Sequence, residues 1–372
     1  MDAALFQIAE RVRAALADHT PLRLRGGGSK DFHALQLQGD LLDTRDWRGI
    51  VSYEPSELVV TVRAGTPLAE LEAVLVAQGQ CLAFEPPHFG AATVGGMVAT
   101  GWSGPSRASV GAVRDYVLGV EILNGRAESL RFGGQVMKNV AGYDVSRLMA
   151  GSWGTLGLIT EVSLKVLPVA PGETTLRFDG LSQAEALQRL NQWGGQPLPL
   201  NASCWVPDAA GADTGSGTLY LRLRGARAAV EAACRSLGGV RLDDAATAAD
   251  WQACREQTLP WFAQRAADHV LWRLSVPQTA PVLALPHGVG APLIEWQGGL
   301  RWVQAPRSQG PALQALAQSV GGSASLFRAE SAGQISASPI FDVQNPAVQR
   351  IQAQLRQAFD PVGIFNPGRT MA

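Results

Sequence analysis

The clearest chemical signal in this sequence is a run of three glycines, in Arg25-Gly26-Gly27-Gly28-Ser29. A turn without Cβ atoms can adopt positive φ and aim successive backbone N–H groups into one concavity, which then binds an anion. The arginine adds a fixed charge and the serine adds a hydroxyl. This combination suits a pyrophosphate, although a glycine turn also occurs without any ligand.

Two further glycine-rich segments accompany this loop. Residues 86–101 join a rigid proline turn to small residues and paired glycines, including Thr93-Val94-Gly95-Gly96. Such a segment lets a flat ring system lie against the main chain. Residues 151–160 form the third segment, which enters a long apolar strand through glycines.

The elements that must position these segments can be predicted from hydrophobic periodicity. A helix is expected over residues 5–16, followed by a strand that delivers the glycine loop, further strands, and a helix that begins at Pro67 and ends before Gly79. The dipeptide Asn124-Gly125 predicts a two-residue hairpin turn. The strands are expected at residues 22–24, 41–43, 49–53, 58–63, 116–123, 126–132 and 157–167.

A cluster of turn formers, Pro168, Pro171 and Gly172, predicts a domain boundary. The expected architecture is α+β, with an N-terminal domain over 1–168, a smaller α+β cap domain over 169–344, and a tail over 345–372 that packs back on the first domain. Cap strands are expected at residues 175–178, 203–206, 219–224, 270–276 and 300–303. Helices are expected at residues 183–192, 227–237, 246–258, 311–319 and 346–359.

Composition excludes several functions. The 31 basic and 32 acidic residues nearly balance and no stretch concentrates Lys and Arg, so we expect no nucleic-acid partner. No stretch reaches the ~20 apolar residues of a transmembrane helix, and the N-terminus lacks a secretory signal pattern. Four cysteines lie far apart without a C-x-x-C pair, so we expect no metal or iron–sulfur site.

The three glycine-rich segments, in this order, resemble the PCMH-type FAD-binding fold of the vanillyl-alcohol oxidase superfamily. The resemblance covers residues 20–168 and implies FAD as cofactor. A nicotinamide Rossmann enzyme fits less well, because the glycines lack G-x-G-x-x-G spacing. Relatives that attach the flavin covalently carry a histidine where this chain has Ser29, so the FAD is expected to be noncovalent.

The resemblance assigns cofactor contacts to specific residues. The loop amides would hold the pyrophosphate, the Thr93–Gly96 wall would line the flavin side, and Ile159 would meet the adenine end. The expected cofactor-binding residues are Arg25, Gly26, Gly27, Gly28, Ser29, Lys30, Pro87, Thr93, Val94, Gly95, Gly96, Gly101, Arg114, Asp115, Gly154, Gly157 and Ile159.

Finer motifs extend the resemblance over nearly the whole chain. Residues 103–107, 111–117, 134–144 and 365–369 are similar to those of the FAD-binding subunits of bacterial glycolate oxidase, also called glycolate dehydrogenase. This family implies oxidation of glycolate to glyoxylate, a larger flavoprotein partner and an iron–sulfur subunit. The missing secretory signal and membrane span predict a cytoplasmic location, with any contact to the inner face of the membrane made through partners.

Oxidation of a 2-hydroxy acid requires a cation for the carboxylate and a base for the hydroxyl proton. Arg273 and Arg369 are the candidate cations and His88, inside the glycine-rich wall, is the candidate base, although structural roles are also open to all three. Arg107, Arg114, His33 and Lys138 are weaker candidates.

The sequence lacks a histidine-containing cap segment that is found in catalytic relatives, and this limits the assignments. The catalytic flavin subunit of the same complex carries a G-D-G-N-[LI]-H segment in its cap, and this sequence has none. An accessory or electron-relay role is therefore expected. One alternative is a self-sufficient flavin dehydrogenase that acts on another small hydroxy acid, such as D-lactate. Another is a scaffold subunit that binds FAD but takes no part in electron transfer.

Overall fold

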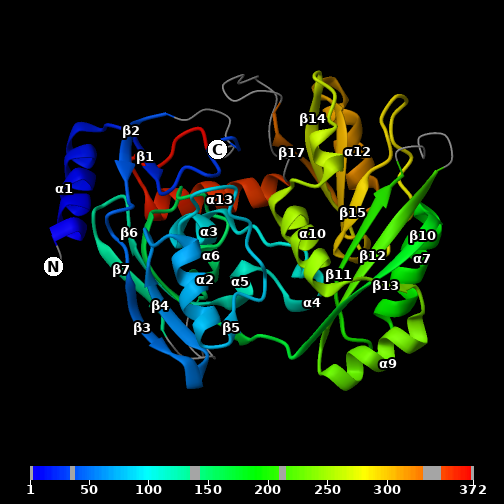
Figure 1. Cartoon of the computed structure of the whole chain (residues 1–372). Coiled ribbons are helices and arrows are strands. Elements are labelled where there is room, and N and C mark those ends of the chain that lie inside the picture. The colour runs from blue at the N-terminus through cyan, green and yellow to red at the C-terminus, as the bar shows by residue number, and fades with distance from the viewer. Residues whose placement is uncertain (1–2, 34–37, 135–142, 209–214, 330–344, 370–372) are drawn as a thin grey trace.

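Two large β-sheets, one in each half of the molecule, organise the computed structural model of this chain (Figure 1). The five-stranded sheet has the order β3-β4-β8-β6-β7 and lies in the N-terminal half, residues 3–168. The eight-stranded sheet has the order β13-β10-β12-β11-β15-β16-β14-β17 and lies in the second half, residues 172–328. The structure describes residues 3–33, 38–134, 143–208, 215–329 and 345–369.

The five-stranded sheet is antiparallel throughout, and short helices pack on it. Leu68, Leu71 and Leu75 form the buried face of the helix after Pro67, as their spacing predicted. The strands are β3 Ile50–Glu54, β4 Val59–Arg63, β6 Val117–Leu123, β7 Ser129–Gly133 and β8 Leu158–Lys165. The helices are α2 Leu68–Ala77, α3 Val94–Thr100, α4 Arg107–Val110, α5 Val113–Tyr116 and α6 Val145–Met149.

A small parallel pair, β1 Leu22–Arg25 and β2 Asp40–Asp43, carries the glycine loop. Parallel strands need a crossover connection, and residues 26–39, which include the loop, supply it. Helix α1 Ala3–Asp18 packs against this pair through Ile8 and Val12. A second short pair, β5 Gln80–Cys81 and β9 Leu167–Pro168, lies near the boundary between the halves.

The hairpin between β6 and β7 differs from the prediction. Residues 124–128 form a five-residue loop instead of a two-residue Asn-Gly turn. The Asn124 side chain accepts hydrogen bonds from the backbone N–H groups of Arg126 and Glu128, both at 2.9 Å. Gly125 has another task, because its N–H donates to Phe359 O at 2.9 Å and so ties the loop to the C-terminal segment.

The eight-stranded sheet is also antiparallel. Its predicted strands are present, whereas β13, β15 and β17 were not predicted, and β13 and β15 are only two and three residues long. The strands are β10 Gly172–Ser182, β11 Leu200–Pro207, β12 Ser216–Gly225, β13 Val240–Arg241, β14 His269–Ser275, β15 Leu293–Glu295, β16 Leu300–Pro306 and β17 Ser323–Arg328. The helices are α7 Gln183–Gly194, α9 Arg227–Leu237, α10 Asp244–Glu256, α11 Pro260–Ala263 and α12 Gly310–Ser319.

The two faces of this sheet have different neighbours. Helices α7, α9 and α12 pack on one face. The other face packs with α10 and meets aromatic residues of the N-terminal half, where Phe327, itself in contact with Trp302, contacts Phe32, Phe89 and Trp102. The side chains that line this contact therefore come from both halves.

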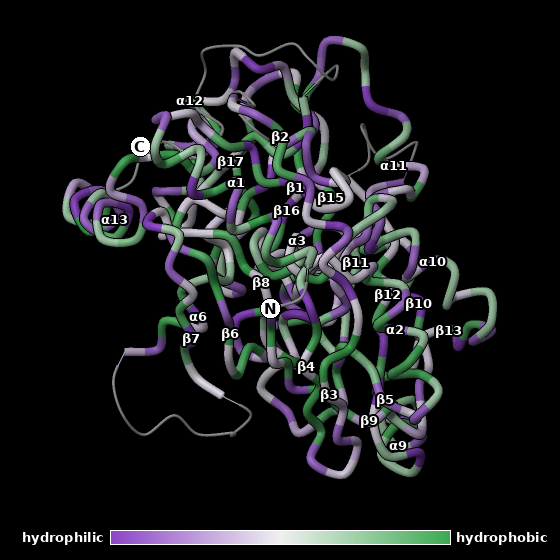
Figure 2. The backbone as a smooth tube through the Cα atoms, turned by 90° about the vertical axis from the view of Figure 1, so that its left-hand side faces the viewer, coloured by the Kyte–Doolittle hydropathy of each residue, from purple (hydrophilic) through white to green (hydrophobic). Residues whose placement is uncertain are grey.

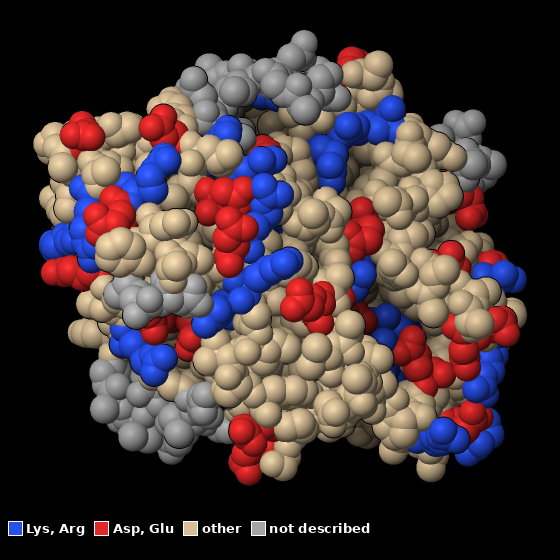
Figure 3. All heavy atoms as spheres, turned by 60° about the vertical axis from the view of Figure 1, so that its left-hand side comes forward, with Lys and Arg blue, Asp and Glu red and all other residues tan. Residues whose placement is uncertain are grey.

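The chain returns to the N-terminal half at its end. Helix α13 Pro346–Phe359 packs there through Leu355 and Phe359, and Figure 2 shows it along its axis at the rim of the molecule. Leu22 and Phe365 then form a parallel bridge, so the tail extends the β1–β2 pair. On the face drawn in Figure 3, basic and acidic side chains are interspersed, without an extended field of one sign.

Candidate cofactor-binding site

The glycine loop lies directly against the wall formed by residues 91–93. A Cβ on Gly27 would stand 1.3 Å from Ala91 O, and one on Gly26 would stand 2.2 Å from Thr93 Oγ1. Only Gly28 of the three has a positive φ, at 70°. Gly28 therefore supplies the left-handed turn that the glycines allow, whereas Gly27 is needed for close approach to the wall.

Lys30 joins the loop to the wall. Its Nζ donates to Ser29 Oγ, Pro87 O and His88 O, each at 3.0 Å. The side chain is buried, and this burial lowers the pKa of Lys30 to about 8, although the charge of Glu256 acts in the opposite direction. A positive charge is therefore held beside the loop at neutral pH.

Two arginines reach the same loop from opposite ends of the chain. Arg25 Nε donates to Asp31 Oδ2 at 2.8 Å, and Arg369 Nη1 lies 3.8 Å from Asp31 Oδ1. The Arg369 Nε is buried and has no hydrogen-bond partner among the described residues. Arg369 was predicted from the sequence as a substrate cation, but its side chain lies at the loop, where it adds positive charge.

The wall continues into helix α3. Thr93 caps this helix by accepting a hydrogen bond from Gly96 N at 3.3 Å. Gly95 permits close contact with the residue that follows β4, because a Cβ there would stand 2.7 Å from that of Ala64. Val94, which was expected to line the cofactor, points into the core and is fully buried.

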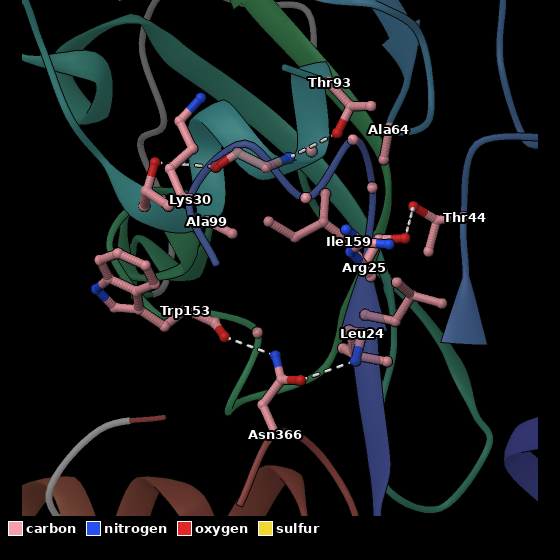
Figure 4. Close-up of a pocket in the computed structure, with 18 of the residues that line it drawn as sticks. Leu24, Arg25, Lys30, Thr44, Ala64, Thr93, Ala99, Trp153, Ile159 and Asn366 are labelled. Carbon is pink, nitrogen blue, oxygen red and sulfur yellow. Dashed lines mark hydrogen bonds between the residues drawn. The ribbon is translucent and has the colours of Figure 1, made fainter. Parts of the chain in front are cut away.

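These segments enclose the first cavity, shown in Figure 4. The loop residues 26–30 line one side, while Leu24, Thr44 and Ile159 line the other. Asn366 closes the edge, because its Oδ1 accepts from Leu24 N and its Nδ2 donates to Trp153 O, both at 2.8 Å. Gly154, Gly157 and the wall residues Thr93, Gly95 and Gly96 also line this cavity.

A second cavity of about 850 Å³ lies where the two halves meet. Thr100 and Trp153 line both cavities, so the two adjoin. Gly101, Arg114 and Arg273, all predicted site residues, line the second cavity. An elongated ligand with an anionic centre and a ring at one end could extend from the first cavity into the second.

His33 is the residue that sequence reasoning underrated. Its ring stacks on Trp153 with centroids 5.0 Å apart, and Nδ1 lies 2.9 Å from Phe327 O in the second half. Because a carbonyl only accepts, Nδ1 carries the proton. Burial lowers the pKa of His33 to about 4, with the Phe327 hydrogen bond opposing this effect and nearby arginines adding to it. Its position just after the glycine loop was the available signal.

His88, the predicted base, does not line either cavity. Its Nε2 lies 2.9 Å from Glu72 Oε2, and its backbone N–H donates to Glu256. This arrangement gives His88 a structural ion-pair environment between the halves. Pro87 contributes its carbonyl to Lys30 and lines a third, smaller cavity with Arg273.

Asp115, a predicted cofactor contact, has a structural task instead. It caps α5, since its Oδ2 accepts from Ala112 N at 2.8 Å, and it lines neither cavity. Lys138 and most of the 134–144 motif lie outside the described residues. Within the described ranges, no group of three or more His, Cys, Asp or Glu side chains could hold a metal ion.

The residues present fit a dinucleotide such as FAD. Arg25, Lys30 and Arg369 place three cationic groups around a glycine turn, and Asp31 is the acidic group beside them. The buried, unpartnered Arg369 Nε supplies a donor that an anion could satisfy. Apolar Leu24 and Ile159 suit a base at one end of this cavity.

Comparison with known proteins supports FAD as the ligand. The FAD binding domain family matches residues 6–133. Glycolate oxidase subunit GlcE of Escherichia coli is 44% identical over 365 residues, which cover 98% of this chain and 96% of that protein. Glycolate oxidase subunit GlcD of Bacillus subtilis is 32% identical over 127 residues, which cover 34% of this chain and 27% of that protein.

More distant similarities extend to other flavoproteins. D-lactate dehydrogenase of Archaeoglobus fulgidus is 31% identical over 189 residues, covering 48% of this chain and 41% of that protein. A solved structure of alkyldihydroxyacetonephosphate synthase superposes with a TM-score of 0.66 at 17% identity, covering 97% of this chain and 74% of that one. This last likeness concerns the fold alone.

The FAD binding domain match and the nearly full-length similarity to a glycolate oxidase subunit identify this chain as an FAD-dependent oxidoreductase. Within that class, the chain belongs to the GlcE family of glycolate oxidase subunits. No helix in the described part of the chain is both long and apolar enough to cross a membrane.

Proposed function

We propose that this chain is the FAD-binding subunit of a glycolate oxidase complex that oxidises glycolate to glyoxylate. The observation that carries the proposal is the cationic glycine-loop cavity adjoining a larger cavity between the halves. The similarity to GlcE over nearly the full length of both chains supports the substrate. Bound FAD would supply an acceptor for the two electrons that leave the substrate carbon.

The cofactor is proposed to be noncovalent and held mainly by the first cavity. Ser29 stands where some relatives have a flavin-attaching histidine, and it contacts Lys30 instead. Arg25, Lys30 and Arg369 would neutralise the pyrophosphate, and the Gly26–Ser29 amides would donate to it. Leu24, Ile159 and Asn366 would form the adenine end.

The larger flavoprotein and the iron–sulfur subunit are proposed as partners, with electrons passing to the latter. GlcD of Bacillus subtilis is also named a glycolate oxidase subunit, and its similarity to this chain supports a relationship between the GlcE and GlcD types of subunit. Cys204 and Cys254 are in contact, but the described residues hold no group of three or more His, Cys, Asp or Glu side chains that could bind a metal. We further infer a cytoplasmic complex whose contact with a membrane, if it forms one, runs through the partners.

The chain is proposed to need its partners for turnover. A general base works best with a pKa near the operating pH, and His33, the histidine of the second cavity, has a pKa of about 4. His88 is engaged with Glu72. His33 is therefore unsuited to accept the hydroxyl proton of glycolate near neutral pH, and His88 lies outside both cavities.

Reconstitution tests this proposal. The chain is mixed with the larger flavoprotein and the iron–sulfur subunit, assembly is followed by gel filtration, and glycolate-dependent reduction of a dye is measured. We expect co-elution and activity, and a loss of activity when this chain is omitted. Equal activity without the chain would refute the proposal, whereas turnover by the chain alone would favour a self-sufficient hydroxy-acid dehydrogenase.

A further inference from the structure

Two arginines from different halves of the molecule converge on one tryptophan ring in the second cavity. The Cζ of Arg107, on α4, lies 4.5 Å from the centroid of Trp296, and the Cζ of Arg273, on β14, lies 5.2 Å from it. Trp296 is fixed, because its Nε1 donates to Gly104 O at 2.9 Å across the boundary between the halves. Both guanidinium groups therefore pack on the same ring in the second cavity.

Neither guanidinium has a counter-ion in direct contact. Within the described residues, no carboxylate oxygen lies within 4 Å of the Arg107 or Arg273 side chain, and neither side chain makes a hydrogen bond. The nearest acids act only at a distance: Asp115 toward Arg107 and Glu295 toward Arg273. Asp115 is already engaged as the cap of α5.

The surroundings add positive charge. Arg114 also lines the second cavity, and the described lining contains no Asp or Glu. Burial lowers the pKa of Arg273 to about 10, and the charge of Arg107 contributes to this shift. Burial likewise lowers the pKa of Arg107. Arg273 is half-buried, whereas Arg107 is in large part exposed, so the cost of an uncompensated charge falls mainly on Arg273.

We propose that Arg107 and Arg273 form a binding site for a small carboxylate in the cavity between the halves. The planar, multiply donating guanidinium suits a carboxylate, and two of them can bind its oxygens from two sides. The ligand class is a two- or three-carbon hydroxy or oxo acid. Its identification as such an acid rests on the proposed function, whereas the existence of an anion site rests on the arginines alone.

This site is distinct from the pyrophosphate cations. Arg25, Lys30 and Arg369 line the first cavity, whereas Arg107 and Arg273 line the second and do not line the first. The two sets therefore have separable effects. Loss of a carboxylate arginine should spare FAD retention, and loss of Lys30 should not.

Calorimetric titration of the FAD-loaded chain with oxalate tests the proposal. Oxalate has no oxidisable C–H bond, so binding is measured without turnover. We expect Arg107→Gln and Arg273→Gln each to raise the Kd for oxalate at least tenfold, with FAD content unchanged, and Arg107→Lys to restore binding only in part. Glycolate should compete with oxalate for the wild-type chain.

Arg241→Gln is the matched control, because it removes one positive charge at an exposed ion pair with Glu231. It should leave the Kd unchanged. If Arg273→Gln does not fold, Arg107→Gln decides the question. An unchanged Kd in Arg107→Gln, or a parallel loss of FAD in both variants, would overturn the site. Oxalate binding together with an inactive reconstituted complex would instead leave the site standing and reject the proposed function.

Discussion

At the scale of single residues, Lys30 carries a charge whose state depends on pH near neutrality. Burial lowers its folded-state pKa to about 8, so the charge is present at pH 7 and is lost as the pH rises through 8. A bound pyrophosphate would stabilise the charged form. We therefore expect the Kd for FAD to rise about tenfold between pH 7 and pH 9, as expected for loss of a charge-assisted hydrogen bond.

Lys30→Met separates this effect from other titrations. The variant should bind FAD weakly at every pH, with a flat profile in fluorescence titration. Tyr116 is not a competing group, because burial raises its pKa to about 12. A wild-type-like pH dependence in Lys30→Met would mean that another group controls cofactor affinity.

Substitution of Gly27 by alanine tests the contact between the glycine loop and the wall. Because a Cβ would stand 1.3 Å from Ala91 O, Gly27→Ala must displace the loop. We expect at least about tenfold weaker FAD binding, equivalent to a loss of ~1.4 kcal/mol. The flavin-to-protein absorbance ratio after gel filtration measures this loss.

Gly290→Ala is the control for Gly27→Ala. Its added Cβ meets no atom within 4 Å, and Gly290 does not have a positive φ. This control should retain full flavin. Full flavin occupancy in Gly27→Ala would show that the cofactor does not depend on this loop.

Residue types alone identified the glycine loop, because consecutive glycines cost conformational entropy on folding and indicate a backbone that needs their freedom. They could not rank the arginines, since Arg107, Arg273 and Arg369 differ only in their three-dimensional surroundings. Arg369 reaches the loop because the C-terminal tail pairs with β1. His33 gains its role from stacking on Trp153 and from Phe327, contacts that no local pattern encodes.

At the scale of elements, Glu85 joins the wall segment to β12. Its carboxylate accepts from Arg222 Nη2 at 2.7 and 2.6 Å and from Arg224 Nη1 at 3.1 Å, while Ser106 N donates to it at 3.1 Å. Burial opposes its ionisation, but the arginines leave the pKa of Glu85 below its ordinary value. The stability from this network is thus present at neutral pH and lost as the pH falls through the folded-state pKa.

Glu85→Gln should lower the free energy of unfolding by about 3 kcal/mol, because it leaves the buried Arg222 without its counter-ion. Urea denaturation at pH 7 measures the change. Glu231→Gln, at the exposed pair with Arg241, should cost less than about 1 kcal/mol. Equal effects of the two substitutions would contradict a structural role for the buried network.

Element prediction succeeded where periodicity was strong. The α9 and α13 helices have the predicted bounds, and the helix after Pro67 buries the predicted leucines. It failed where tertiary contacts decide: β15 is a three-residue strand held between β11 and β16, and Gly125 is occupied by the C-terminal segment. Helix α3 was not predicted, because Val94-Gly95-Gly96 has low helix propensity. The sequence indicated only a glycine-rich segment there.

At the scale of the whole molecule, the α+β fold and the FAD cofactor follow from the sequence, and the arrangement of the halves does not. The division into 1–168, 169–344 and 345–372 stays a prediction. Tryptophan is enriched at protein interfaces, but Trp272, Trp296 and Trp302 are each less than 5% exposed and belong to the core. The surface that meets the partner subunits is thus not found among these tryptophans.

The central claim is that this chain binds FAD but oxidises glycolate only in the assembled complex. The most direct test is anaerobic rapid mixing of the FAD-loaded chain with glycolate, followed by its flavin absorbance. We predict that the absorbance persists with the chain alone and that glycolate-dependent reduction begins when the larger flavoprotein and iron–sulfur subunit are added. Rapid bleaching of the flavin without any partner would contradict this claim and make the chain a dehydrogenase in its own right.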